Sequence, residues 1–132
     1  MQKGTTLIEL IVYIAIVAGF LAVAVNFSWE IIYGNVKSQT MREVQQNSRF
    51  AMEKVVSALK NGEPAASFGV SNNILEQNGI ALTTERVRVT NFQISSLEGA
   101  YKINLTIEHI NQGSLNQYEA SLNTETTVSL RN

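Results

Sequence analysis

The chain lacks several residue types on which catalytic and metal sites depend. Its 132 residues include no cysteine, and all 11 acidic residues are glutamate. A disulfide is therefore impossible, and the composition says nothing about redox compartment. With no cysteine, no aspartate and no histidine besides His109, metal centres, catalytic thiols and Ser-His-Asp triads are excluded or lack a member. We expect His109 to be an edge or partly buried strand residue, and we expect no enzymatic activity, no cofactor and no metal site.

An excess of charge of either sign is also missing. The formal net charge is −1 and no basic tract is present, so electrostatic binding of nucleic acid is not expected. Arg86 and Arg88 alternate with Val87 and Val89, which predicts only a small basic pair on a solvated strand face. Aspartate-rich loops of the kind that hold calcium are absent, so a calcium site is not expected either.

Against these absences stands one long apolar run, Leu7 to Val25, with a single charged residue, Glu9. Its 19 residues extend about 28 Å as an α-helix and match a hydrocarbon core roughly 30 Å thick. An ionised side chain costs on the order of 2.5 to 3.5 kcal/mol at mid-membrane, and less near the end of a span. The positive end of the helix dipole offsets only about 0.3 to 1 kcal/mol of this cost. Glu9 is therefore expected to have a partner and is a functional candidate.

The order Lys3-Gly4-Thr5-Thr6-Leu7-Ile8-Glu9, continued by apolar residues, resembles the class III signal of type IV pilins and type II secretion pseudopilins. The resemblance is close over residues 1–25 and extends to the remainder only in layout. It implies that a prepilin peptidase cuts after Gly4 and that Thr5 becomes an N-methylated N-terminus. It also implies that Glu9 pairs with the N-terminal amine of a neighbouring subunit during assembly. The family most often has Phe or Met where this chain has Thr5.

Two other interpretations of the N-terminal segment remain open. Ala22-Val23-Ala24 has the small-x-small form of a signal-peptide cleavage site, although Glu9 and the length of the run argue against one. A plain single-pass anchor explains the length but gives no reason for the carboxylate. Lys3 predicts a cytoplasmic N-terminus with the body of the chain outside. Trp29 and Tyr33 are four residues apart, and we expect them at the membrane interface or in packing contacts along the helix.

A second helical pattern follows the apolar run. Residues 30–60 contain no proline, and apolar residues recur at three- and four-residue steps, which predicts an amphipathic stem helix. The sequence Asn-Gly-Glu-Pro at 61–64 predicts that this helix ends near Leu59. A continuous helix from Thr5 to Leu59 is about 80 Å long, which suits a filament subunit better than a compact domain. The apolar stripe is predicted to comprise Met41, Val44, Ser48, Ala51, Met52, Val55, Val56 and Leu59.

Beyond the stem the apolar period changes from about 3.6 to 2 residues, which predicts β-strands. The alternation is clear over residues 101–107 and 118–130. A change of parity at Thr90-Asn91 predicts a bulge, and Asn78-Gly79 predicts a two-residue hairpin turn. We expect an antiparallel meander of four or five strands laid on the stem stripe.

These patterns predict an α+β fold, a pilin-like lollipop with a long N-terminal helix packed on a small antiparallel β-sheet head. The predicted parts are a leader (1–4), a transmembrane or filament-core helix (5–29), an amphipathic stem helix (30–61) and a β head (62–132).

The resemblance also indicates a function. The stem segment from Ser48-Arg49-Phe50-Ala51-Met52 to Leu59 resembles those of minor pilins and minor pseudopilins. We therefore expect a non-enzymatic minor subunit of a type IV pilus or a type II secretion-like pseudopilus. Its expected partners are prepilin peptidase, other pilin or pseudopilin subunits, the inner-membrane platform protein of the assembly machine, and lipid. The expected location is the cytoplasmic (inner) membrane, with the head outside, and then an extracytoplasmic filament. The alternative is a single-pass anchored extracytoplasmic binding module that does not polymerise.

Overall fold

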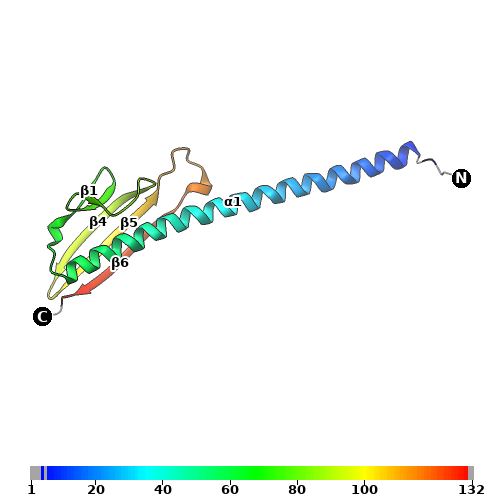
Figure 1. Ribbon diagram of the computed structural model, residues 1–132. Coiled ribbons are helices and arrows are strands. Elements are labelled where there is room, and N and C mark those ends of the chain that lie inside the picture. The colour runs from blue at the N-terminus through cyan, green and yellow to red at the C-terminus, as the bar shows by residue number, and fades with distance from the viewer. Residues whose placement is uncertain (1–3, 5, 131–132) are drawn as a thin grey trace. The chain divides into compact units, whose positions relative to one another are not determined.

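The computed structural model describes Gly4 and residues 6–130 and has an α+β architecture (Figure 1). The described part of the chain divides after Asn35 into two compact units, the first containing the N-terminal part of helix α1 and the second everything from Val36 onward. The predicted α+β class is confirmed. The elements are α1 (Leu7–Lys60), η1 (Ala65–Ser67), β1 (Phe68–Ser71), β2 (Ile74–Gln77), β3 (Ile80–Ala81), β4 (Val87–Leu97), β5 (Ala100–His109), η2 (Asn116–Tyr118) and β6 (Ser121–Ser129).

Helix α1 ends by a motif that its sequence specifies. Gly62 adopts a φ of +87°, a left-handed conformation that glycine takes without a Cβ penalty. The Gly62 N–H donates to Leu59 O at 3.2 Å, and the Glu63 N–H donates to Ala58 O at 3.0 Å. These are the two hydrogen bonds of a Schellman motif, and they satisfy carbonyls that the helix itself leaves free. The predicted end of the helix is therefore confirmed to within one residue.

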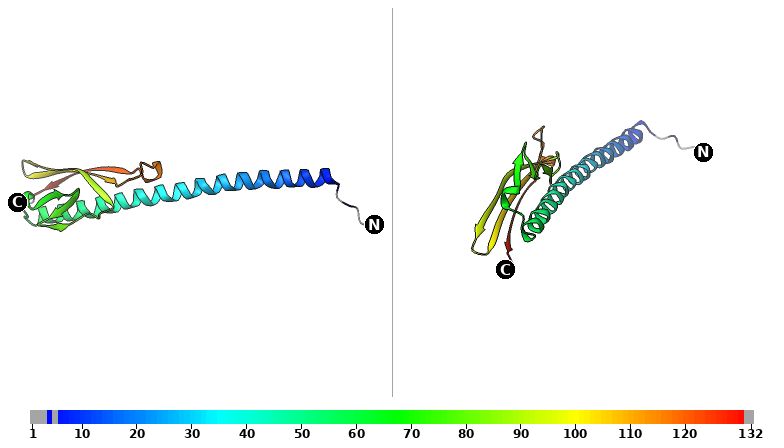
Figure 2. Two further views of the ribbon diagram at one scale, coloured as in Figure 1. Left: turned by 90° about the horizontal axis from the view of Figure 1, so that it is seen from above. Right: turned by 60° about the vertical axis from the view of Figure 1, so that its left-hand side comes forward.

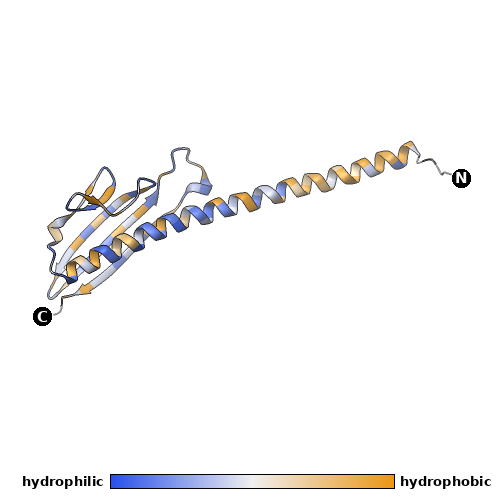
Figure 3. Ribbon diagram, viewed as in Figure 1, coloured by the Kyte–Doolittle hydropathy of each residue, from blue (hydrophilic) through white to orange (hydrophobic). Residues whose placement is uncertain are grey.

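The stem part of α1 buries one stripe against the β-strands. Figure 3 shows the change from a continuously apolar N-terminal part to mixed polar and apolar residues in the second unit. The prediction was wrong at Met41, which is 36% exposed, and at Val56, which is only partly buried. Thr40 is buried in place of Met41. Its hydroxyl donates a hydrogen bond to Val36 O at 2.9 Å, so the buried side chain is not left with an unpaired donor. The buried residues are Thr40, Val44, Ser48, Ala51, Met52, Val55, Ala58 and Leu59.

Strands β1, β2 and β3 form a small antiparallel sheet. The predicted hairpin is confirmed, because Gln77 pairs with Ile80 across Asn78 and Gly79, both of which have positive φ. Strand β1 was not predicted, since its four residues include Gly69 and show no clear alternation.

Strands β4, β5 and β6 form a second antiparallel sheet, so the predicted single meander was wrong. Strand β3 ends at Ala81, and just beyond it the Thr83 hydroxyl accepts the Leu75 N–H at 3.1 Å, where a side chain replaces a backbone partner. The predicted bulge is confirmed by the shift of register between Val89 and Asn91.

The two sheets and the stem stripe share one apolar core. Figure 2 shows the β4–β5–β6 sheet running along one side of the stem part of α1. Ile103, Leu105 and Ile107 of β5 are fully buried, as their predicted parity requires. The predicted strand over 118–130 begins too early, because residues 116–118 form the helix η2 and β6 starts at Ser121. The ring of Tyr118 instead stacks on His109, with centroids 6.2 Å apart.

Candidate functional site

The N-terminal part of α1 presents an apolar surface on every side. Each residue from Leu7 to Val25 is helical and exposed. Among the described residues, α1 is the one helix long and apolar enough to cross a membrane, by length and composition. A helix meets the main demand of a hydrocarbon interior, because its backbone N–H and C=O groups bond to one another.

Glu9 lies in the first turn of α1, where the positive end of the helix dipole favours a carboxylate. The Glu9 N–H donates to the Thr6 hydroxyl at 3.4 Å, which is half of a capping box of the form Thr-x-x-Glu. The other half needs the Glu9 carboxylate to bond to the Thr6 N–H, and that bond is not formed between these described residues. Among residues 6–130 the carboxylate has no salt-bridge partner. Thr6 therefore caps the start of α1, which sequence reasoning missed, and the Glu9 carboxylate is open to another molecule.

The predicted cleavage position adjoins this helix. Gly4 is exposed and precedes α1 without regular structure. Thr5, the predicted N-terminus after cleavage and the predicted methylation site, lies outside the described residues, as does Lys3 of the leader.

Trp29 and Tyr33, the predicted interface pair, are exposed on α1 at 59% and 50%.

The first polar side chains after the apolar run bond to their own helix. Asn26 Nδ2 donates to Ala22 O at 2.8 Å. Ser28 Oγ donates to Ala24 O at the same distance. Polar groups that bond to the preceding turn in this way leave fewer donors for solvent.

His109 sits in a polar cluster between β5 and the stem helix. Its Nε2 lies 3.2 Å from Glu43 Oε2, while Arg86 Nη1 donates to Glu43 Oε1 at 2.8 Å. The His109 side chain is 14% exposed, which confirms the prediction of a partly buried strand residue. Sequence reasoning missed Glu43 as the shared partner, because 43 residues separate it from Arg86. Within the described part of the chain, no group of three or more His, Asp or Glu residues could hold a metal ion.

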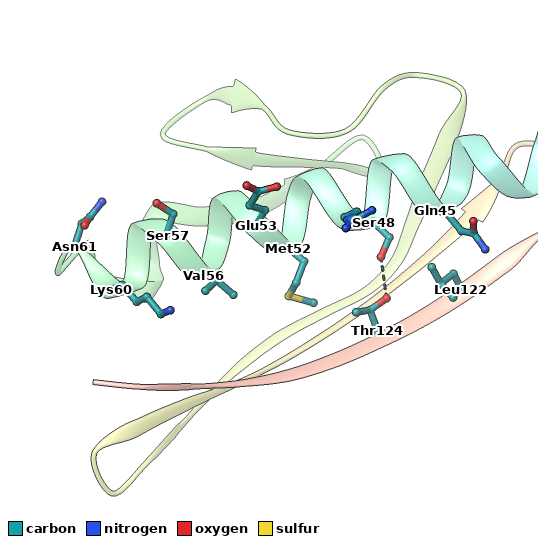
Figure 4. Close-up of a pocket in the computed structure, with 11 residues that line it drawn as sticks. Gln45, Ser48, Met52, Glu53, Val56, Ser57, Lys60, Asn61, Leu122 and Thr124 are labelled. Atoms are coloured by element: carbon teal, nitrogen blue, oxygen red, sulfur yellow. Dashed lines mark hydrogen bonds between the residues drawn. The ribbon is translucent and has the colours of Figure 1, made fainter. Parts of the chain in front are cut away.

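A groove of about 570 Å³ runs between the stem helix and β6 (Figure 4). Met52 and Val56 of α1 face Leu122 and Thr124 of β6 across it, and Ser48 bonds to Thr124 at its floor. Sequence reasoning did not predict this groove, since it arises from the register of two elements far apart in the chain. The helix side of the groove also carries Gln45, Arg49, Glu53, Ser57, Lys60 and Asn61.

Comparison of the chain with protein-family models, with curated proteins and with solved structures finds no match.

Proposed function

We propose that the chain is a membrane-anchored, pilin-like structural subunit, a minor component of a type IV pilus or a type II secretion-like pseudopilus. The observation that carries the proposal is Glu9, the only charged residue of the 19-residue run from Leu7 to Val25. A plain anchor gains nothing from a carboxylate in that position, whereas an assembling helix gains a means of pairing with its neighbour.

The proposed mechanism begins with processing. Prepilin peptidase cuts after Gly4 on the cytoplasmic side of the membrane and creates a new amine on Thr5, which is then N-methylated. The cut removes Lys3 and leaves Glu9 one helical turn from the new N-terminus.

Assembly then uses the new amine and the carboxylate as partners on different subunits. The protonated amine of one subunit pairs with Glu9 of its neighbour, and each charge offsets the cost of placing the other in lipid. The apolar side chains from Leu7 to Val25, exposed in the isolated chain, pack against other subunits as the filament forms. Because the pairing joins adjacent helices, it also sets how far one subunit is displaced along the filament from the next.

The remainder of the chain has a different task in this proposal. The unit from Val36 onward has its own apolar core and lies outside the cytoplasmic membrane. It is carried into the filament by the helix, with the platform protein of the inner membrane as the assembly partner. No step of this function requires a catalytic residue or a cofactor in the chain.

The proposal is tested by the intact mass of the protein extracted from membranes of cells that contain a prepilin peptidase. The expected mass is lower than that of the full chain by Met-Gln-Lys-Gly, with the increment of one methyl group on Thr5. The variant Gly4→Leu is the matched control, and it should keep its leader because the peptidase requires a small residue before the cut. A wild-type chain that keeps residues 1–4 would favour the anchored binding module, and a mature chain that starts at Val25 would favour a cleaved signal peptide.

A further inference from the structure

Strand β6 forms an open edge of the β4–β5–β6 sheet. At one end of the strand pair, the His109 N–H donates to Ala120 O at 2.8 Å. At the other end, the Leu130 N–H donates to Gly99 O at 2.9 Å. Even-numbered residues of this segment therefore direct their backbone groups at β5, and the odd-numbered ones direct theirs away from the sheet. Within residues 6–130 these outward groups have no backbone partner, and they belong to Ser121, Asn123, Glu125, Thr127 and Ser129.

The other strand edges of this unit are short, or are interrupted and engaged near one end. Strand β1 has four residues and β3 has two. Strand β4, the opposite edge of the β4–β5–β6 sheet, has eleven residues, but it is bridged to the first sheet where the Val89 N–H donates to Asn73 O at 2.8 Å, and its register shifts between Val89 and Asn91. Strand β6 has nine residues, no proline and one charged side chain, Glu125, whose carboxylate is paired with Lys102 at 2.9 Å. Proteins usually protect a long edge with charge, proline or a bulge, and β6 has little of this protection.

The groove beside β6 lies on the face of the sheet that packs against the stem helix. A strand added to this edge lies about 4.8 Å from β6, on the side of the groove. Every second side chain of that strand then points into the space bounded by Met52, Val56 and Leu122. The edge supplies backbone hydrogen bonds and the groove supplies apolar contact, which are the two components of recognition by strand addition.

We propose that β6 is the receiving edge for an extended segment of a different protein chain, with apolar residues at alternate positions that fill the groove. The spacing of the outward N–H and C=O groups is complementary to a β-strand backbone. Arg49, Glu53 and Lys60, on the helix side of the groove, have no salt-bridge partner among the described residues, and their net positive charge favours an acidic residue in the incoming segment. A second copy is disfavoured, because full-length antiparallel pairing of β6 with itself sets Glu125 opposite Glu125. This inference does not depend on polymerisation.

The experiment selects nine-residue peptides from a random library on the full chain in detergent micelles. Enriched peptides should carry apolar residues at every second position. The variant Thr127→Pro removes an outward N–H and no bond to β5, and it should weaken their binding by about tenfold or more. The matched control Thr127→Ala keeps that N–H and should bind within about twofold of the wild type. Hydrogen exchange of the β5 amides should be alike in both variants, which shows that the sheet is intact.

A second variant keeps the test decisive if Thr127→Pro disturbs the sheet. Val56→Glu places a charge in the groove without touching the backbone of β6, and it should also abolish binding of the alternating peptides. Three outcomes overturn the proposal: no peptide is enriched, the enriched peptides bind Thr127→Pro as well as Thr127→Ala, or the chain dimerises through β6 in a manner that Thr127→Pro abolishes. The last outcome would identify the occupant as a second copy.

Discussion

Ser48 Oγ and Thr124 Oγ1 lie 2.8 Å apart and join the stem helix to strand β6 across 76 residues of sequence. The two hydroxyls differ in their surroundings. Ser48 is 1% exposed, whereas Thr124 is only partly buried, beside the groove. This bond therefore links a buried group that needs a protein partner to a group that water can reach.

The first prediction follows from this asymmetry. Thr124→Val leaves the Ser48 hydroxyl buried without its partner and should lower the free energy of opening by about 1 to 3 kcal/mol. Ser48→Ala leaves Thr124 able to bond to water and should cost only about 0.5 to 1.5 kcal/mol. Hydrogen exchange of the β5 amides, measured on the full chain in micelles, checks both values. The double variant should cost less than the sum of the two. A larger loss for Ser48→Ala than for Thr124→Val would contradict the assignment of Ser48 as the more dependent partner.

The second prediction concerns the end of α1. Gly62→Ala should destabilise the head by about 1 to 2 kcal/mol, because a Cβ is strained at a φ of +87°. Space is not the cause, since no atom lies within 4 Å of the position that the Cβ would take. Gly69→Ala is the matched control: its site is equally open, its φ is not positive, and we expect no loss of stability. Thermal melting followed by circular dichroism compares them, and equal melting temperatures would show that the Schellman motif contributes nothing.

The sequence predicted the elements whose signals are local. The Asn-Gly-Glu-Pro stop at 61–64, the Asn78-Gly79 turn and the alternation around Ile103 each depend on a few adjacent residues, and all three are confirmed. The split into two sheets was missed because the partner of each strand depends on contacts between separate segments, which the alternation within a strand does not indicate. The alternation of polar and apolar residues also predicted a strand at Tyr118, but this residue lies in the helix η2.

The candidate sites divide in the same way. The apolar run and Glu9 are visible in the sequence because membrane length and charge are properties of one continuous segment. Three features depend on contacts between distant segments: the groove, the open edge of β6, and the sharing of Glu43 between Arg86 and His109. No pattern within a single segment predicts them.

The third prediction is that the unit from Val36 onward folds without the apolar helix. A chain shortened to begin at Asn35 keeps the buried stripe, whose large side chains contribute roughly 1.5 to 3 kcal/mol each. It should be soluble and monomeric. A chain shortened to begin at Gly62 keeps every strand but uncovers one face of the sheets, and it should aggregate or remain unfolded. Gel filtration and circular dichroism distinguish the two. A folded monomer from the shorter chain would show that the strands close their own core and that the stem is only a spacer.

The fourth prediction separates the charge of Glu9 from the ability of its side chain to complete the capping box with Thr6. Glu9→Gln keeps a side chain able to complete the capping box but removes the charge, whereas Glu9→Ala removes both. If pairing with a neighbour's amine is the function, both variants should insert into membranes at wild-type levels and both should be depleted from sheared filaments. The measurement is the ratio of the chain in the filament fraction to that in the membrane fraction. Normal incorporation of Glu9→Gln with loss of Glu9→Ala would assign the residue to helix capping, and normal incorporation of both would make the carboxylate dispensable.

The bonds that Asn26 and Ser28 make to Ala22 and Ala24 bear on the depth at which α1 would sit in a membrane. A polar side chain that has already found an acceptor in the preceding turn loses less on leaving water than one that is free. The end of the apolar run near Val25 is therefore not a sharp limit. A shift of the helix by one turn, about 5.4 Å, further into the bilayer costs less free energy than it would with unbonded polar side chains. A helix with such a boundary tolerates displacement along the membrane normal, which is the movement that the proposed assembly into a filament would require.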